Sequence, residues 1–392
     1  MHHDRRYENF VVFLAPLINS VAGIAIDLYA PSLPAIGREL AATPALMQST
    51  ITVTLVGYAI GQLFFGLTAD AVGRRKSIIA GLGLFVAASV GAALAQSIGV
   101  LMLARVVQGF AIGSCQVVAR AVLVDVVKGP RFYVAIAYLS LAFGLGPVIA
   151  PFVGGHVQEL AGWRWNFALY AVYGLFVLAF AGVGLRESLS PQYRKSARAS
   201  IVGYKMILSS RQFLAGVVVI GASFSSFLIW NVVGPFVMES LGYGAVAFGT
   251  SALAVGACYL VGTLLNRLLV KRVAPDRLMI FGAGLFVVGL AGLAFGGTRL
   301  HIVSALAGVM TIAFGQGWIF SNAMGRQMSL FPDRAGTAAS LQGCLMILFG
   351  TVATALVSDT VVTSDLTLFA IFVILFLTQA SALFVSGRLS RT

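Results

Sequence analysis

Charge is scarce in this chain, and acidic charge is scarcest. Only 10% of its 392 residues are charged, with 13 Asp and Glu against 26 Lys and Arg. Hydrophobic residues make up 59% of the chain, and the mean hydropathy is +0.95. These values lie far outside the range of a soluble domain. The composition therefore predicts an all-α protein that crosses a membrane many times.

Cysteine and histidine are also rare. Cys115, Cys258 and Cys344 each lie alone in an apolar stretch, which excludes a disulfide framework and metal-ligand spacing. The four histidines lie at the N-terminus or in loops, and the sequence has no Gly-x4-Gly-Lys-Ser/Thr loop to hold a nucleotide phosphate. The sequence therefore predicts no enzyme, no metal and no cofactor. Active transport would have to draw on an ion gradient.

Long apolar runs fill the chain instead. A helix needs about 20 apolar residues to cross roughly 30 Å of hydrocarbon, and twelve such spans fit between the charged or Gly/Pro-rich breaks. The residues before the first span are too few and too charged to precede a cleavable signal, so this span is expected to stay as an anchor. The predicted spans are 10–30, 46–69, 77–96, 98–123, 132–155, 164–185, 212–238, 247–270, 278–297, 302–324, 335–357 and 366–386.

The cations alternate from loop to loop. Only Arg38, Arg164 and Arg299 lie on one side, Arg105 and Arg120 fall inside spans, and all other Lys and Arg lie on the side that holds both termini. The positive-inside rule then places both termini in the cytoplasm. The net charge of +13 is therefore explained by topology rather than by nucleic-acid binding.

A basic segment divides the chain into two sets of six spans. The first set contains Gly66-x3-Asp70 followed by two arginines, and a weak echo follows 196 residues later as Gly262-x3-Asn266. Repeated halves with a central site are common in transporters. The expected parts are an N-terminal half (1–185), a cytoplasmic linker (186–211) and a C-terminal half (212–392).

Asp27 is the only acid well inside a predicted span. An ionised carboxylate there costs about 2.5–3.5 kcal/mol, so it should face water or a cation, or be protonated. Such a group can bind and release a proton; the alternative is an interfacial Asp that caps the turn before Pro31. Arg105 lies at a similar depth and is expected to meet Asp27, unless it extends to the outer headgroups.

Three further motifs stand out. A stripe of Gly146, Ala150 and Gly154 permits close packing against another helix. Two prolines near it predict a bend in this helix, which is either part of a gate or a static kink. The turn after the second span carries Gly66, Asp70, Gly73, Arg74 and Arg75; the fourth span carries Gln108, Gly109, Gly113, Arg120 and Asp125; the fifth carries Gly144, Gly146, Pro147, Pro151, Gly154 and Gly155.

Polar groups within the later spans are neutral. Amide, indole and aromatic side chains there are either hydrogen-bonding handles in an apolar substrate pocket or ordinary contacts between helices. The substrate-binding candidates are Asn19, Tyr29, Phe227, Trp230, Asn231, Gln316, Trp318 and Asn322.

These motifs resemble a known family. The turn from Gly66 to Lys76 resembles the loop between helices two and three of the major facilitator superfamily. Arg105-x2-Gln108-Gly109 resembles its fourth-helix motif, and residues 144–155 resemble the fifth-helix motif of its proton-coupled exporters. The resemblance covers essentially the whole chain and implies twelve helices in two pseudo-symmetric halves.

Finer motifs, at 27–34, 120–121, 162–167, 320–323 and 335–338, resemble the bicyclomycin and chloramphenicol resistance (Bcr/CflA) branch. This resemblance implies a drug:proton antiporter of the bacterial inner membrane that exports small, mainly apolar compounds by alternating access and so gives antibiotic resistance. It also implies protons as coupling ion, a lipid-embedded functional monomer, Asp27 with Arg105 as coupling pair, and Asp70 with Arg74 as inner gate contact. The alternative is a proton-coupled exporter or importer of a metabolite or siderophore.

Two positions depart from the related exporters. Asn19 stands where some of them carry an acid, and Leu123 stands where the branch often carries a second arginine.

Overall fold

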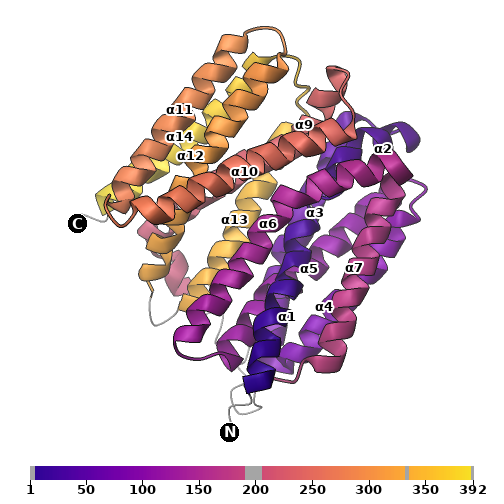
Figure 1. Cartoon of the computed structure of the whole chain (residues 1–392), viewed down its shortest axis with the longest axis vertical. Coiled ribbons are helices and arrows are strands. Elements are labelled where there is room, and N and C mark those ends of the chain that lie inside the picture. The colour runs from indigo at the N-terminus through magenta and orange to yellow at the C-terminus, as the bar shows by residue number, and fades with distance from the viewer. Residues whose placement is uncertain (1–4, 190–204, 332–334, 390–392) are drawn as a thin grey trace. The chain divides into compact units, whose positions relative to one another are not determined.

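The computed structural model describes residues 5–189, 205–331 and 335–389. Within these ranges, twelve helices are long and apolar enough to cross a membrane, as predicted. The helices, in chain order, are α1 (Arg5–Ile24), η1 (Ala30–Ser32), α2 (Leu33–Glu39), α3 (Pro44–Val72), α4 (Arg74–Ala93), α5 (Ile98–Val126), α6 (Pro130–Ala161), α7 (Trp163–Gly184), α9 (Arg211–Ser240), α10 (Ala245–Leu269), α11 (Pro275–Gly296), α12 (Ile302–Ser329), α13 (Ala335–Ser358) and α14 (Asp365–Leu389) (Figure 1).

The chain divides into two compact units. Unit 1 comprises Met1–Ala42 and Thr50–Gly203, and unit 2 comprises Thr43–Ser49 and Tyr204–Thr392. The boundary near residue 203 falls inside the predicted linker, of which residues 190–204 lie outside the described ranges. Below, the helix ends that adjoin the basic loops are called inner ends, following the orientation predicted above.

The first predicted span is wrong in its extent. Helix α1 ends at Ile24, and residues 25–29 form turns before η1 and α2. Asp27 therefore lies in a break after α1 and not inside a helix. Hydropathy cannot register such a break, because the residues around Asp27 are as apolar as a helix would be. Pro31 and Pro34 favour it, since a proline removes a backbone donor and disfavours helix in the residue before it.

In unit 1, α1 packs against α5, α6 and α7, and α4 packs against α5 and α7. The predicted small-residue stripe of α6 faces the end of α1 and the break that follows it. A Cβ atom on Gly146 would lie 2.4 Å from the carbonyl carbon of Gly23, and one on Gly154 would lie 1.7 Å from the carbonyl oxygen of Leu28. Only glycine permits these approaches. Helix α6 runs unbroken through Pro147 and Pro151.

In both units, glycines allow two corresponding helices to cross closely: α3 and α5 in unit 1, and α10 and α12 in unit 2. In unit 1 a Cβ on Gly61 of α3 would lie 2.0 Å from the carbonyl oxygen of Phe110 in α5. In unit 2 a Cβ on Gly262 of α10 would lie 2.3 Å from the carbonyl oxygen of Phe314 in α12. The two crossings are of the same kind, and basic residues follow the inner end of both α3 and α10.

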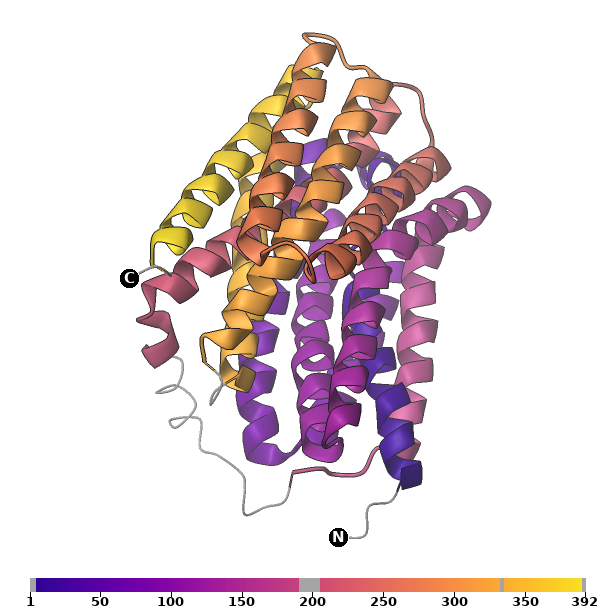
Figure 2. The ribbon, with the colours of Figure 1, turned by 60° about the vertical axis from the view of Figure 1, so that its left-hand side comes forward.

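Unit 2 is built around α9, which packs against α10, α12, α13 and α14. Helix α11 packs against α12 and α14 on the far side of α12, and the three run side by side in Figure 2. Most of α9 is buried, and its sequence is rich in Gly, Ser and Val, which occupy little space.

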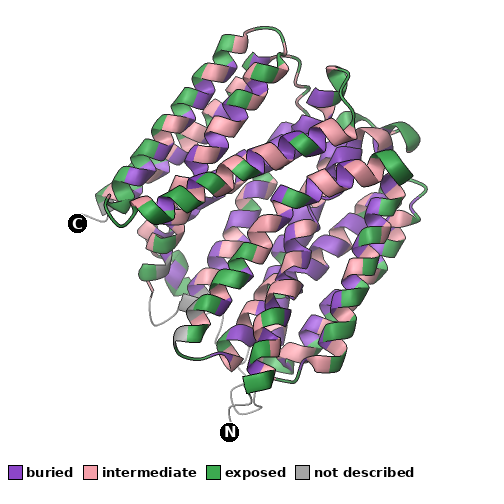
Figure 3. Cartoon of the chain, in the orientation of Figure 1, coloured by how far each residue is buried: buried purple, intermediate pink, exposed green. Residues whose placement is uncertain are grey.

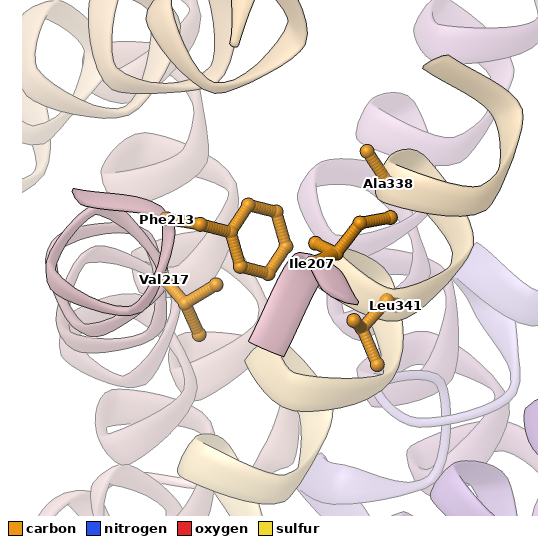
Figure 4. Close-up of a cluster of buried hydrophobic side chains, with 5 residues drawn as sticks. All are labelled: Ile207, Phe213, Val217, Ala338 and Leu341. Carbon is orange, nitrogen blue, oxygen red and sulfur yellow. The ribbon is translucent and has the colours of Figure 1, made fainter. Parts of the chain in front are cut away.

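The start of unit 2 is held by an apolar cluster. Ile207, in a helical turn before α9, lies between Phe213 and Val217 of α9 and Ala338 and Leu341 of α13 (Figure 4). All five side chains are buried. The cluster fixes the last described part of the predicted linker onto unit 2.

Large apolar side chains are exposed along many of the helices. Leu160, Val183 and Phe295 are 86–94% exposed, and Figure 3 shows exposed residues along the outward sides of the helices. A water-soluble protein avoids contiguous apolar surface of this kind. The pattern is that of helices whose outward sides face lipid.

We predict that Gly113→Ala destabilises the protein, because the new Cβ would lie 2.3 Å from the carbonyl carbon of Gly61. Overpacking of this kind costs about 1–3 kcal/mol. Thermal unfolding of the purified protein in detergent should show a clearly lower Tm. Gly83→Ala, where nothing lies within 4 Å of the new atom, is the matched control and should leave Tm unchanged. Equal Tm values for both variants would contradict the crossing.

Candidate functional site

Arg105 of α5 lies at the break after α1. Its side chain is fully buried. Its Nη1 donates to the carbonyl oxygen of Ala25 (3.1 Å) and to Oε1 of Gln108 (2.6 Å). Gln108 in turn donates to Oγ of Ser89 on α4 (2.7 Å). The guanidinium is therefore anchored on one side to the broken end of α1 and on the other to α4.

The break explains why polar groups gather here. Where a helix ends, its last carbonyl groups lose their intrahelical partners, and in a membrane they must find others. Arg105 donates to the carbonyl oxygen of Ala25. The carbonyl oxygen of Ile24 accepts the backbone N–H groups of Asp27 (3.1 Å) and Leu28 (3.2 Å), and the hydroxyl of Tyr170 adds a third donor (3.3 Å). A cation at the C-terminal end of a helix is also favoured by the helix dipole.

Aromatic rings cover the guanidinium. Its central carbon lies 4.0 Å from the ring centroid of Tyr29 and 5.9 Å from that of Phe167. The Tyr29 hydroxyl is hydrogen-bonded to Oγ1 of Thr50 on α3 (2.8 Å). A desolvated cation over an aromatic face gains about 2 kcal/mol. Tyr29, one of the predicted substrate-binding candidates, is fully buried beside Arg105.

Asp27 belongs to the same cluster. Its side chain is buried, and Asp27 and Arg105 both lie within electrostatic range of the Tyr29 and Tyr170 hydroxyls. Within the described residues, Nε and Nη2 of Arg105 make no hydrogen bond. The structure thus brings the two predicted coupling residues to one place, with two guanidinium donors still available.

The turn between α3 and α4 forms an ion-pair network at the inner end of unit 1. Arg74 Nη1 lies 2.5 Å from Oδ1 of Asp70, and Arg74 Nε lies 3.2 Å from Oδ2 of Asp125. Ser188 Oγ donates to the same Asp125 oxygen (2.9 Å). The three residues predicted from two separate motifs, Asp70, Arg74 and Asp125, therefore meet. Gly66 lies one turn before Asp70 in α3.

Glu187 completes this inner network, although sequence reasoning assigned it no functional role. Its carboxylate accepts backbone N–H groups of Arg74 (2.8 Å), Arg75 (3.2 Å) and Leu189 (3.1 Å). It therefore caps α4, with Gly73 as the N-cap at φ +115°; a Cβ there would lie 2.4 Å from a Glu187 oxygen. The signal was its isolation: Glu187 is the only acid between residues 186 and 211.

Arg75 caps the C-terminal end of α7. Its Nε and Nη2 donate to the carbonyl oxygens of Leu185 and Gly182 at the end of α7, each at 2.8 Å. Arg75 and Glu187 thus join α4 and α7 through two helix ends of opposite polarity, and each charge matches the dipole of the helix it caps.

A second ion pair closes the opposite end of unit 1. Glu39 of α2 accepts hydrogen bonds from Arg164 and from the indole of Trp163 on α7, and Arg164 also donates to the carbonyl oxygen of Ala95 (3.0 Å). The hydrogen bond from Arg164, followed by that from Trp163, lowers the pKa of Glu39 below its usual value.

Asn19 links α1 to α6 by a hydrogen bond. It is buried, and its Nδ2 donates to the carbonyl oxygen of Leu139 on α6 (2.9 Å). Gly144, by contrast, faces open space.

In unit 2, Gln316 of α12 lies at the centre of a buried amide network. Gln316 and Gln379 of α14 exchange hydrogen bonds of 3.1 and 3.0 Å. Gln379 also donates to Oγ of Ser223 (2.7 Å), and Gln316 donates more weakly to Ser226 (3.4 Å). Sequence reasoning missed Ser223, Ser226 and Gln379. The signal for Gln379 was that it is the only amide side chain in α14.

The other candidates in unit 2 occupy several places. Asn322 donates to Asn266 of α10 (2.7 Å) and to its own helix. The rings of Phe227 and Tyr259 are 6.4 Å apart. Asn231 is buried. Within the described residues, the indole nitrogens of Trp230 and Trp318 and the hydroxyl of Ser225 have no hydrogen-bond partner.

We predict that Glu187→Ala lowers the free energy of unfolding by about 1–2 kcal/mol, the usual cost of a lost helix cap. Thermal unfolding in detergent measures this. Glu187→Gln keeps one acceptor oxygen and should lose less. A wild-type Tm for Glu187→Ala would contradict the assignment of this carboxylate as the cap of α4.

The Glu39 contact should depend on pH. Because the pKa of Glu39 is lowered in the folded protein, its stabilisation is present above the usual pKa of about 4.3 and is lost as pH falls through the folded value. The Tm advantage of wild type over Glu39→Gln should therefore shrink between neutral pH and about pH 3. Glu159→Gln, an exposed acid near the end of α6, is the control. A gap that is constant with pH would contradict the pairing.

The protein is similar over most of its length to known transporters. It is 28% identical to "Uncharacterized MFS-type transporter YdgK" of Bacillus subtilis over 361 residues, covering 88% of each chain. It is 29% identical to "Multidrug resistance protein MdtL" of Shewanella oneidensis over 327 residues, covering 82% of each chain. It is 30% identical to the Escherichia coli O139:H28 protein of that name over 325 residues, covering 82% of this chain and 81% of that one.

Solved structures agree on the fold. A crystal structure of a D-xylose-proton symporter superposes with a TM-score of 0.77 at 18% identity and covers 97% of both chains. A partially occluded inward-open structure of the xylose transporter XylE from E. coli gives 0.75 at 16% identity, covering 98% of both chains. Residues 17–355 match the family model described as Major Facilitator Superfamily. This multi-pass membrane protein belongs to the Major Facilitator Superfamily of transporters, and not to a family of enzymes.

Proposed function

We propose that this protein exports small, mainly apolar compounds in exchange for protons, as a drug:proton antiporter of the Bcr/CflA type. Two of its relatives carry the name multidrug resistance protein. The observation that carries the proposal is the buried Asp27 beside a fixed, fully buried Arg105 at the break after α1.

The proton would be held at Asp27. Arg105 is fixed by Ala25, Gln108 and the Tyr29 ring, whereas Asp27 stands on non-helical backbone. When ionised, the carboxylate can accept the available Nε and Nη2 donors of Arg105; when protonated, it needs no cation. Since an ionised carboxylate alone costs about 2.5–3.5 kcal/mol in the membrane, the proton and the guanidinium are alternative ways to stabilise it.

Substrate binding would shift this balance toward proton release to the inside, and alternating access would carry the exchange. In that cycle Asp70, Arg74 and Asp125 would break and remake their contact at the inner end. The exchange of one proton for one neutral substrate at 100 mV supplies about 2.3 kcal/mol. This corresponds to roughly a 50-fold gradient, which is sufficient for resistance.

The proposal also specifies the oligomeric state, the membrane and the coupling ion. The protein would work as a monomer in the bacterial inner membrane, with both termini in the cytoplasm, protons as coupling ion, and a small-molecule substrate as its only other partner.

The test is proton release from energised inside-out vesicles on addition of neutral, cationic and anionic drugs. Wild type should release protons with at least one compound, and Asp27→Asn should abolish the response. Asp276→Asn is the control, because this acid is exposed at the start of α11.

An equal response in wild type and Asp27→Asn would remove Asp27 as the proton site. No response of membrane-inserted wild type to any compound would contradict drug export and favour a carrier of one metabolite.

A further inference from the structure

Arg120 is the second cation inside a membrane-spanning helix, and the proposed cycle does not use it. It lies six residues before the end of α5 at Val126, about 9 Å along the axis. Its side chain is partly exposed, while Val118 and Ala119 beside it are buried. Arg120 is therefore accessible at a depth where a charge is expensive.

Within the part of the chain that the structure describes, the charge of Arg120 has no partner of opposite charge. Among the described residues, no carboxylate or hydrogen-bond acceptor pairs with Arg120. Asp125, the nearest acid along the chain, is taken by Arg74 and Ser188. Elsewhere in unit 1, Arg131 and Arg164 each have a carboxylate partner. An arginine inside a membrane protein marks a functional site unless it is paired or extends to the headgroups.

A second donor lies one turn away on the same face of α5. Gln62 of α3 donates its Nε2 to Oε1 of Gln116, which fixes the amide so that the Nε2 of Gln116 is its free end. Residues four apart on a helix are neighbours, so this N–H group and the Arg120 guanidinium face the same space. Tyr58 of α3 lies beside Gln62 and within electrostatic range of Arg120.

We infer that Arg120 and Gln116 form a subsite for the anionic group of an organic substrate. The planar guanidinium donates two parallel hydrogen bonds to a carboxylate or phosphate, and the amide adds a third donor. The inference rests on the proposed transport function and narrows its substrate class to mainly apolar molecules that carry one oxyanion.

The experiment is equilibrium binding to the purified full-length protein in nanodiscs of phosphatidylcholine, with 2-naphthoate, 2-naphthamide and inorganic phosphate as probes. Naphthoate should bind at least 10-fold more tightly than the neutral amide. Arg120→Gln should remove this preference, Arg120→Lys should keep part of it, and Gln116→Leu should weaken it. Arg267→Gln, a cation in the last turn of α10, is the matched control. Binding of phosphate in place of naphthoate, lost in Arg120→Gln, would also support the site and assign it to phosphorylated substrates.

Three results would overturn the inference: equal affinity for naphthoate and naphthamide without binding of phosphate, an anion preference that survives Arg120→Gln, or no binding of any anion by folded wild type. Nanodiscs with phosphatidylglycerol test whether Arg120 instead binds lipid. If this lipid raises Tm in wild type but not in Arg120→Gln, and naphthoate does not bind, then Arg120 binds lipid headgroups and not a substrate. Anion binding requires no proton gradient, so the two proposals can fail separately. If the protein binds anions through Arg120 but shows no drug:proton antiport, the proposed proton coupling is wrong and the anion subsite stands.

Discussion

The structure of unit 1 depends on the buried guanidinium of Arg105 at the broken end of the first helix. The break leaves carbonyl groups without partners inside an apolar protein, and Arg105 supplies donors for one of them while Gln108 and Tyr29 hold it in place. The same break puts Asp27 on non-helical backbone near a fixed cation. A continuous first helix would satisfy its own backbone and would give Arg105 no reason to be buried there.

The few other charges follow the same rule and lie where helices end. Glu187 caps α4, and Arg75 caps α7. In unit 2 the buried Asp365 accepts the backbone N–H of His301 (3.2 Å) at the start of α12, and also the hydroxyl of Ser304. In a chain with 13 acids, these charges are placed where unpaired backbone groups would otherwise be most costly. Arg120 is the exception that needs an external partner.

The sequence predicts the twelve spans well because length and hydropathy decide them, and it predicts the meeting of Asp70 and Arg74 because they are one helical turn apart. It does not predict the break at Ile24, since apolar residues surround it on both sides. It also misses Glu187 and Gln379, because Glu187 accepts from Arg74, 113 residues away, and Gln379 bonds to Gln316 and Ser223, 63 and 156 residues away. Long-range pairs of this kind depend on how helices pack, and one sequence carries no direct signal of that packing.

The central claim is that Asp27 titrates against Arg105. Infrared difference spectroscopy of the purified protein during a pH titration measures it directly, through the carbonyl band of a protonated carboxyl group. The account predicts a titrating band that is absent in Asp27→Asn and whose midpoint moves to higher pH in Arg105→Gln, because loss of the cation favours the protonated acid. A midpoint that is unchanged in Arg105→Gln, or a spectrum that is unchanged in Asp27→Asn, would contradict the account.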